Sequence, residues 1–303
     1  HTGGFIGYAN ASTFSNIGLY FNNSLIKTES LSYEGRNTAT DTNSAFCGGF
    51  AGELYGNSRL SNIMFASYDE TDFKIIGTTS NLESIQNTIP GGGDYKGENY
   101  IGGMVGRIKH TVIENCTFKG SETTKNFIKM SGHESPDSAF CGGIVGLIQK
   151  NSQNSDSNII NCEVSNTDIS GNATCIDLGI GNPDIYIGGI VGAAYMHGTN
   201  NKVTISDCRL YYSTVYALGN EVIATYAGGI IAGATWESSL EISDCYVFEC
   251  DIESITSTTI QDDNVIESSS AGIIALVGAN TNITISNSVV IDTSIEANVQ
   301  STF

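Results

Sequence analysis

Residues 142–146 read Gly-Gly-Ile-Val-Gly, and near-copies of this stretch recur along the chain. A second signature follows each copy, and in the fourth repeat it reads Ile-Ile-Asn-Cys-Glu-Val over residues 159–164. Such repetition predicts one supersecondary unit stacked along an axis, each unit burying its apolar face against the next. The repeats start at Gly3, Gly48, Gly102, Gly142, Gly188, Gly228 (a looser copy) and Ala271 (a degenerate one).

The second signature contains a column of Asn and Asp residues, and apolar residues stand at even spacing before the column and at odd spacing after it. A plain strand keeps one parity, so the switch predicts a bend, and Asn and Asp tolerate left-handed backbone better than other non-glycine residues. We expect the stacked amides to hydrogen-bond along the column. The column consists of Asn16, Asn62, Asn115, Asn161, Asp207, Asp244 and Asn287.

The glycine signature carries two apolar columns at successive positions, for example Ile144 and Val145. Successive residues of a strand point to opposite faces, so we expect one column to line the core and the other to need a second cover. The long variable segment of each repeat is the expected cover, with another molecule as the alternative. The paired glycines would let that cover approach the backbone closely.

These patterns predict an all-β protein: a right-handed parallel β-helix of about seven long coils, with residues 1–303 as a single β-solenoid domain. Seven repeats of 40 to 54 residues also fit a seven-bladed β-propeller. A propeller blade needs four antiparallel strands with tight hairpins, whereas each of these repeats has two well-defined signatures and one segment of variable length and sequence. The β-solenoid is therefore the favoured prediction.

The Gly-Gly-Ile-Val-Gly start with a following Ile-Ile-Asn-Cys or Ile-Ser-Asp-Cys segment resembles the GLUG-motif repeats of secreted and surface proteins. The resemblance extends from Gly3 to about Ile295 and weakens at both ends, where Ile17, Ile63 and Ser288 replace Cys. It implies a stalk, spacer or adhesive module, with any catalysis in a different domain.

The composition is acidic, with 13 Lys and Arg against 32 Asp and Glu and a formal net charge of −19. Such a charge repels phosphate backbones and anionic lipid, so we expect neither nucleic acid nor membrane insertion. Ser, Thr, Asn and Gly dominate, as in β-rich surface proteins, and we expect an extracellular or cell-surface location. A chain that starts at His1, without a signal-peptide pattern, is expected to be processed or excerpted.

Eight cysteines are present, and four of them follow the Asn/Asp column in consecutive repeats: Cys116, Cys162, Cys208 and Cys245. Coils about 4.8 Å apart would allow disulfides between neighbours in this column. A ladder of buried free thiols is the favoured interpretation. We name Asn161, Asp207 and Asp244 with these four cysteines as the structural ladder.

Five N-glycosylation sequons occur. Asn115 stands at the position of the predicted bend, which we expect to be a packed corner, so no glycan is expected there. Asn22 and Asn172 fall in variable segments and are the better candidates, followed by Asn10 and Asn282. The chain is in this respect a candidate glycoprotein.

No catalytic constellation is predicted. Asp168, residues 262–263 and Arg107 stand in fragments similar to those of pectin-cleaving β-helix enzymes, but in the wrong order and spacing. The acidic runs around Asp69 and Asp262 would suit calcium but match no calcium-loop template, so we expect no cofactor or metal. The tyrosines Tyr211, Tyr212 and Tyr216 would suit carbohydrate stacking or sheet cover.

We therefore expect a non-enzymatic structural protein, a protomer of a surface fibre, filament or stalk that self-associates by solenoid stacking or continues a longer solenoid. Terminal coils without polar caps would offer unpaired strand edges for this association. The alternative is a surface adhesin module that binds host protein or glycan through its loops. A polysaccharide-degrading enzyme is the distant third alternative.

Overall fold

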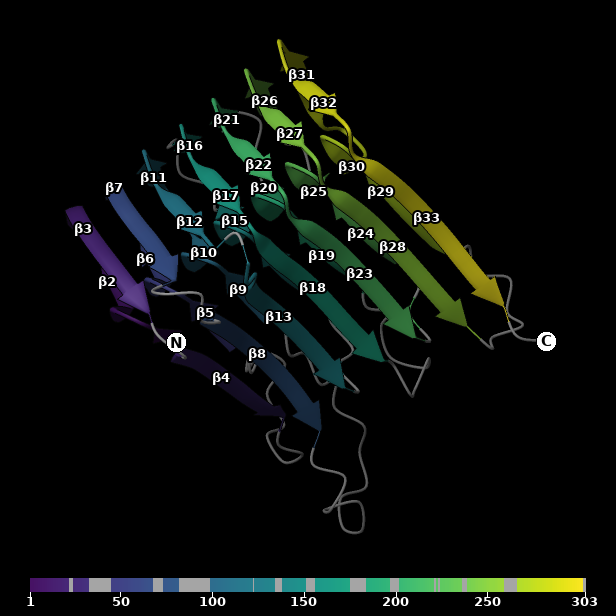
Figure 1. Cartoon of the computed structure of the whole chain (residues 1–303), viewed down its shortest axis with the longest axis horizontal. Helices are drawn as coiled ribbons and strands as arrows, with labels where there is room; N and C mark the ends of the chain where they lie inside the picture. Colours follow the sequence, from purple (N-terminus) through teal and green to yellow (C-terminus); the bar gives the residue numbers. More distant parts are fainter. Residues whose placement is uncertain are drawn as a thin grey trace.

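The computed structural model describes residues 1–21, 24–32, 45–67, 73–81, 99–121, 123–133, 138–150, 156–174, 184–196, 202–220, 222, 224–235, 239–258 and 266–301. Within these residues the chain passes through four parallel sheets, A to D, seven times in succession (Figure 1). We number the passes coils 1 to 7. The predicted parallel β-solenoid is confirmed. The β-propeller is wrong, because its blades would need antiparallel strands.

Each coil contributes one strand to sheet A and one to sheet B. Sheet A contains β1 (Thr2–Gly3), β5 (Ala45–Gly48), β9 (Asn99–Gly102), β14 (Ala139–Gly142), β19 (Asp184–Gly188), β24 (Ala224–Gly228) and β29 (Glu267–Ala271). Sheet B contains β2 (Ile6–Asn10), β6 (Ala51–Tyr55), β10 (Val105–Ile108), β15 (Val145–Lys150), β20 (Val191–Met196), β25 (Ile231–Thr235) and β30 (Ile274–Val277).

Sheet C is crossed by one long strand in coils 1 and 2 and by two short strands in each later coil. It contains β3 (Thr13–Phe21), β7 (Ser58–Ser67), β11 (Thr111–Glu114), β12 (Thr117–Lys119), β16 (Ser157–Ile160), β17 (Glu163–Ser165), β21 (Lys202–Ser206), β22 (Arg209–Tyr211), β26 (Ser239–Ser243), β27 (Tyr246–Phe248), β31 (Asn282–Ser286) and β32 (Val289–Ile291). Sheet D contains β4 (Ser24–Ser32), β8 (Phe73–Asn81), β13 (Asn126–His133), β18 (Thr167–Thr174), β23 (Thr214–Asn220), β28 (Asp251–Thr258) and β33 (Ser294–Ser301).

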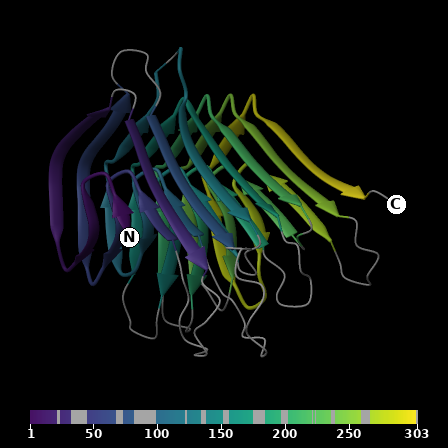
Figure 2. The same ribbon diagram turned by 90° about the horizontal axis from the view of Figure 1, so that it is seen from below.

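Equivalent residues of successive repeats stack in register. Val145 of β15 pairs with Val105 on one side and Val191 on the other, all at the same position of the glycine signature. The sequence colours accordingly advance along one axis from coil 1 to coil 7 (Figure 2). Every column read from the sequence is therefore a physical row of side chains along the solenoid.

The glycine signature is a bend between sheets A and B and not a single strand. In coil 4, β14 ends at Gly142 and β15 begins at Val145, with the chain bending over Gly143 and Ile144. Because of this bend, Ile144 and Val145 both enter the same hydrophobic core, where each is fully buried. The expectation that the two columns point to opposite faces is wrong, because alternation of faces holds only within a regular strand.

Left-handed backbone forms three further bends of the coil, one within sheet C, one between sheets B and C and one between sheets C and D. The Asn/Asp column has φ values from 48° at Asn161 to 58° at Asn16, so the bend predicted there is confirmed. Two further left-handed corners were not predicted. The corner between sheets B and C contains Ala11, Asn57, His110 and Asn280, and the corner between sheets C and D contains Asn166, Tyr212, Glu249 and Asp292.

A Ser, Thr or Cys residue follows many of these corners and stabilises them. The Ser213 hydroxyl donates to the carbonyl of Tyr211 at 2.7 Å, and the Thr167 hydroxyl donates to the carbonyl of Ser165 at 2.9 Å. The Ser12 hydroxyl does the same to Asn10 at 2.9 Å. Such local side-chain bonds satisfy a carbonyl that the corner takes out of the regular ladder.

The outer faces of sheets A and B cover each other. Phe140 of β14 points out of the main core yet is fully buried, and its ring meets Tyr195 of β20 edge-on at 5.0 Å between centroids. Gly106 lies in the same angle, where an added Cβ would stand 2.7 Å from the carbonyl oxygen of Tyr100. The solenoid itself thus provides cover for the outer side chains of sheet A through sheet B, and most of the variable segments predicted as the cover lie outside the described residues.

Candidate interaction surfaces

The predicted structural ladder lies along one corner of the solenoid. The Asn161 side-chain amide donates to the Asn115 oxygen at 2.8 Å, and Asn62 donates to Asn16 at 3.0 Å. Asp207 and Asp244 continue the row as exposed left-handed residues. These bonds tie neighbouring coils together at a position where the regular backbone ladder is interrupted.

The cysteine column lies directly inside this corner. All seven cysteines in the described part of the chain are buried free thiols, so no disulfide joins Cys116 to Cys162 or Cys208 to Cys245. Each of the four thiols of the column donates to the carbonyl two residues before it, as Cys162 does to Ile160 at 3.4 Å. Burial raises the pKa of Cys162, which favours its protonated, unreactive form. The eighth cysteine, Cys175, lies outside the described residues.

A row of stacked rings fills the angle between sheets A and B. Neighbouring centroids are 4.4 to 5.6 Å apart, and neighbouring planes are inclined by 7° to 25°. We call this row, made of His1, Phe46, Tyr100, Phe140, Tyr186 and Tyr226, the aromatic column. This row was not predicted, although an aromatic residue stands two places before the first glycine in repeats two to six.

A buried ion pair lies at the N-terminal part of the same angle. Arg107 contacts Glu53 at 2.9 Å, and its guanidinium carbon lies 4.2 Å from the Phe46 ring centroid. Glu53 is 5% exposed, and Lys109 and His1 lie at 4.0 and 3.5 Å from its carboxylate. The carboxylate is thus enclosed by groups that can carry positive charge, which offsets the cost of its burial.

The carboxyl group of Asp184 lies in the C-terminal part of the angle between sheets A and B. Burial raises the pKa of Asp184 to about 6, the Tyr186 hydroxyl opposes the shift by donating at 3.1 Å, and the nearby Glu267 carboxylate adds to it. The folded state therefore binds this proton more tightly than the unfolded chain does. The resulting stabilisation is complete below the unfolded pKa of about 3.9 and is lost as the pH rises through about 6.

Asp184→Asn is expected to raise the free energy of unfolding by ~2 kcal/mol at about pH 8 and to leave it unchanged at about pH 4. The amide cannot ionise and still offers an oxygen to the Tyr186 hydroxyl. Urea denaturation at the two pH values measures the difference. Asp292→Asn, at an exposed corner, is the control for the change of side chain itself, and we expect it to change the free energy of unfolding by less than about 0.5 kcal/mol. An equal effect of Asp184→Asn at both pH values would contradict a raised pKa.

The C-terminal coil exposes residues of the core columns. Ile285 of β31 is 46% exposed, whereas its neighbour Ile242 in coil 6 is fully buried. Val290 and Ile295 are 37% and 45% exposed, although the residues that precede them in their columns are buried. At the other end, Phe5 is 52% exposed and Phe14 is half-buried. Both ends of the described solenoid therefore present apolar core to solvent.

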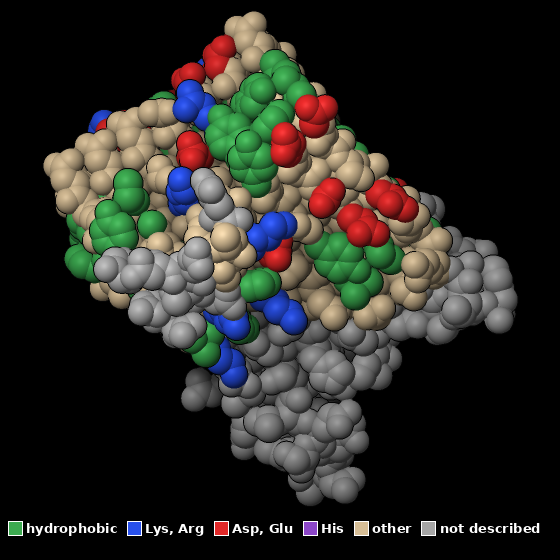
Figure 3. Space-filling model, in the orientation of Figure 1, with side chains coloured by type: hydrophobic (Ala, Val, Ile, Leu, Met, Phe, Trp, Pro, Cys, Tyr) green, Lys and Arg blue, Asp and Glu red, His purple; other side chains and the backbone are tan. Residues whose placement is uncertain are grey.

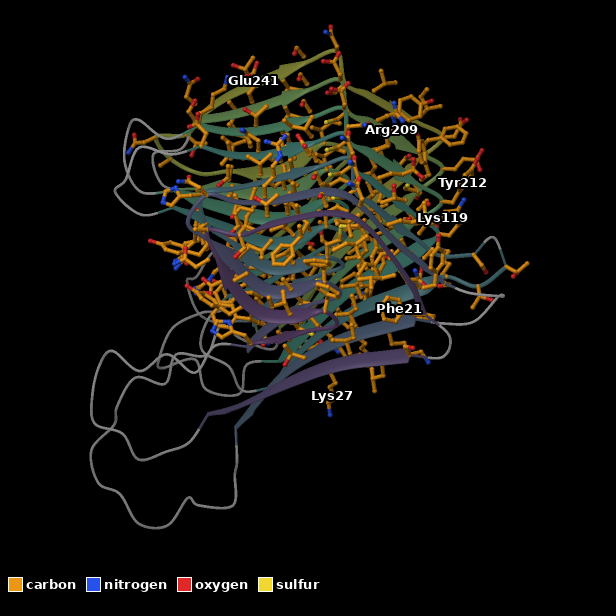
Figure 4. All side chains as sticks on the ribbon, turned by 90° about the vertical axis from the view of Figure 1, so that its left-hand side faces the viewer. Phe21, Lys27, Lys119, Arg209, Tyr212 and Glu241 are labelled. Carbon is orange, nitrogen blue, oxygen red and sulfur yellow. The ribbon has the colours of Figure 1, made fainter. Side chains whose placement is uncertain are left out.

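The clustered tyrosines divide between two faces. Tyr211 and Tyr212 lie with Tyr246 and Phe248 on the outer face of sheet C, with ring centroids 5.7 to 6.5 Å apart. Tyr216 lies on the next face, in β23 of sheet D. Tyr212 occupies the corner between the two faces and projects outward (Figure 4).

The candidate glycosylation sites lie in different surroundings. Asn10 and Asn282 are exposed, and Asn22 is outside the described residues. Asn172 lies within the regular strand β18 and not in a variable segment, and its side-chain oxygen is buried. Asn115 stands at an exposed corner and not a packed one, where it accepts the bond from Asn161. Asn10 and Asn282 are thus the more accessible of the described candidates.

The enzyme-like fragments are not brought together. Arg107 lies on sheet B in the angle facing sheet A, whereas Asp168 lies on sheet D, where it pairs with Lys125 at 3.0 Å. Residues 262–263 and the acidic run around Asp69 are outside the described residues. Among the residues that are described, no group of three or more His, Cys, Asp and Glu side chains could hold a metal ion.

Comparison with protein-family models, curated proteins and solved structures found no match to this chain. In the part of the chain that the structure describes, no helix has the length and apolar character needed to cross a membrane. The functional interpretation therefore depends on the surfaces described above.

Proposed function

We propose that this chain is an extracellular structural protein that forms a fibre or stalk by stacking solenoids end to end. The observation that carries the proposal is the exposed core of coil 7. Ile285, Val290 and Ile295 belong to columns that are buried in coils 3 to 6, and each would be buried again by one more coil. Burial of an Ile or Val side chain contributes ~1.5–3 kcal/mol, which favours a coil in that place.

The two ends match each other column by column. Asn287 of coil 7 and Asn16 of coil 1 both have the left-handed backbone of the amide ladder. Ile285 and Val290 share their columns with Phe14 and Leu19, so apolar residues would meet apolar residues. Coil 1 of a second copy therefore fits coil 7 in the register that already joins coil to coil within the chain.

The backbone at the ends supports the same arrangement. Strands β29, β30, β31 and β33 stand at one edge of their sheets, and β1, β2 and β4 stand at the opposite edge. Each of these strands has no neighbour on one side among the described strands. Such edges present backbone donors and acceptors that pair readily with another chain.

Val290→Lys is expected to abolish fibres, because it places a charge where the next coil would be buried. The matched control is Val289→Lys, since Val289 is 42% exposed on the same strand but belongs to an outward column. Negative-stain electron microscopy and light scattering measure assembly, and circular dichroism checks that both variants fold. Dispersed single solenoids of the unmodified chain, or fibres of Val290→Lys, would contradict end-to-end stacking.

A further inference from the structure

We propose that the outer face of sheet D pairs with the same face of a second copy of this chain, with the two solenoid axes antiparallel. This lateral contact goes beyond end-to-end stacking and does not depend on it. Two of its outward columns have described side chains in every coil from 1 to 7. The first contains Leu25, Lys74, Phe127, Asp168, Thr214, Asp251 and Ser294, and the second contains Lys27, Ile76, Lys129, Ser170, Tyr216, Glu253 and Glu296.

Charge is segregated along this face. In coils 1 to 3 the charged members of the two columns are Lys27, Lys74 and Lys129, and in coils 5 to 7 they are Asp251, Glu253 and Glu296. Figure 3 shows Lys and Arg gathered over the N-terminal strands of this face and Asp and Glu over its C-terminal strands. Lys27 projects away from the solenoid wall (Figure 4). Over these two columns the face is therefore positive at one end and negative at the other.

A two-fold axis that lies in the contact plane, parallel to the strands and through coil 4, brings these ends together. It places coils 1, 2 and 3 of one copy against coils 7, 6 and 5 of the other. Each column then faces the same column of the second copy. Lys27 then faces Glu296 of the second copy, and Lys74 faces its Asp251. Lys129 faces Tyr216, whose ring offers a cation–π contact. Parallel axes would instead place the lysine-bearing coils of the two copies against each other, and likewise the carboxylate-bearing coils.

The centre of the face is suited to contact with itself. In coil 4 the two columns contain Asp168 and Ser170, which would meet their own copies at the axis. Lys125 of the same chain lies 3.0 Å from Asp168 and neutralises it, so two like charges do not oppose each other there. Ser170 is small and uncharged, which permits close approach of the two sheets.

The area of the face is adequate for a specific dimer. Seven strands at ~4.8 Å spacing and about eight residues at ~3.3 Å each give ~900 Å² per copy for the whole outer face of sheet D, of which the two columns above cover about half. Specific interfaces bury about 800 Å² per partner. Leu25 is 56% exposed, and Phe127, Ile76 and Tyr216 are half-buried on this surface, so its apolar groups would gain from the contact.

Cysteine cross-linking tests the predicted geometry. In the Val290→Lys background, which removes end-to-end stacking, Ser170→Cys is expected to give a covalent dimer with a bis-maleimide reagent that spans ~10 Å, because facing sheets pack ~10 Å apart. The dimer is seen on a denaturing gel. Ser294→Cys is the control, because Ser294 would face Leu25 of the second copy and should not cross-link to itself. No dimer from Ser170→Cys, or equal dimer from both variants, would overturn the antiparallel pairing.

Charge reversal tests the contacts themselves. In the same background, Lys74→Glu or Asp251→Lys alone is expected to weaken the dimer at least ~10-fold, because each creates two like-charge contacts across the two-fold axis. The double variant Lys74→Glu with Asp251→Lys should restore it. Sedimentation velocity measures the dissociation constants, and added salt should weaken the unmodified dimer. A monomer at all concentrations, or single reversals without effect, would overturn the proposal whether or not fibres form.

Discussion

Gly143→Ala is expected to lower the free energy of unfolding by about 3 kcal/mol or more. A Cβ on Gly143 would stand 2.1 Å from the carbonyl oxygen of Gly189 in the next coil and 2.8 Å from a methyl group of Val164. The first neighbour is backbone and cannot move without opening the bend of coil 5. Urea denaturation followed by circular dichroism measures the loss.

Gly18→Ala is the matched control for this substitution. At Gly18 the nearest atom to an added Cβ is Cε2 of Tyr20, at 3.1 Å, and Tyr20 is a 63% exposed side chain that can turn away. We expect a change within about 0.5 kcal/mol, as at most surface positions. If the two variants unfold at the same urea concentration, the close approach of successive coils at the glycine bend is contradicted.

The same contact explains why the glycine is repeated. A Cβ on Gly103 would stand 2.0 Å from the carbonyl oxygen of Gly143, and one on Gly189 would stand 2.1 Å from that of Gly229. The second glycine of each signature therefore lies against the second glycine of the next. The motif that identifies the repeats in the sequence is a stacking contact, which is why it recurs at every coil.

The features that the sequence predicts correctly are those set by the backbone of a single repeat. The Asn/Asp column was predicted as a left-handed bend because the parity of apolar residues changes there, and parity is visible in the sequence alone. The glycine signature was misinterpreted because Ile144 and Val145 look like consecutive strand residues. Whether such a pair lies in a strand or in a bend depends on the packing of Gly143 against the next coil, which no single repeat reveals.

Sheet D and the aromatic column could not be predicted from the sequence. The strands of sheet D lie between the second signature of one repeat and the glycine signature of the next, where the sequence looks variable. Their inward column is nevertheless apolar from Ile26 to Ile295. Chain segments of unequal length separate this column from the glycine signature, and these hide the period. The aromatic column was visible as a pattern, but its burial depends on two sheets that face each other across a sharp bend.

Phe140→Ala is expected to cost ~3–5 kcal/mol of stability, as for other fully buried aromatic residues. The ring is fully buried and lies 5.6 Å from Tyr100, 5.2 Å from Tyr186 and 5.0 Å from Tyr195, measured between centroids. Truncation removes the contacts of coil 4 with coils 3 and 5 in this angle and leaves a cavity between two sheets. Chemical denaturation of the unmodified chain and the variant gives the difference.

Two controls separate packing from stacking in this result. Phe140→Leu keeps most of the apolar volume and loses only the ring contacts, so we expect a cost of ~1–1.5 kcal/mol. Tyr20→Ala removes an exposed aromatic residue and should change the free energy of unfolding by less than about 0.5 kcal/mol. If Phe140→Ala cost no more than Tyr20→Ala, the angle between sheets A and B would not be a second core.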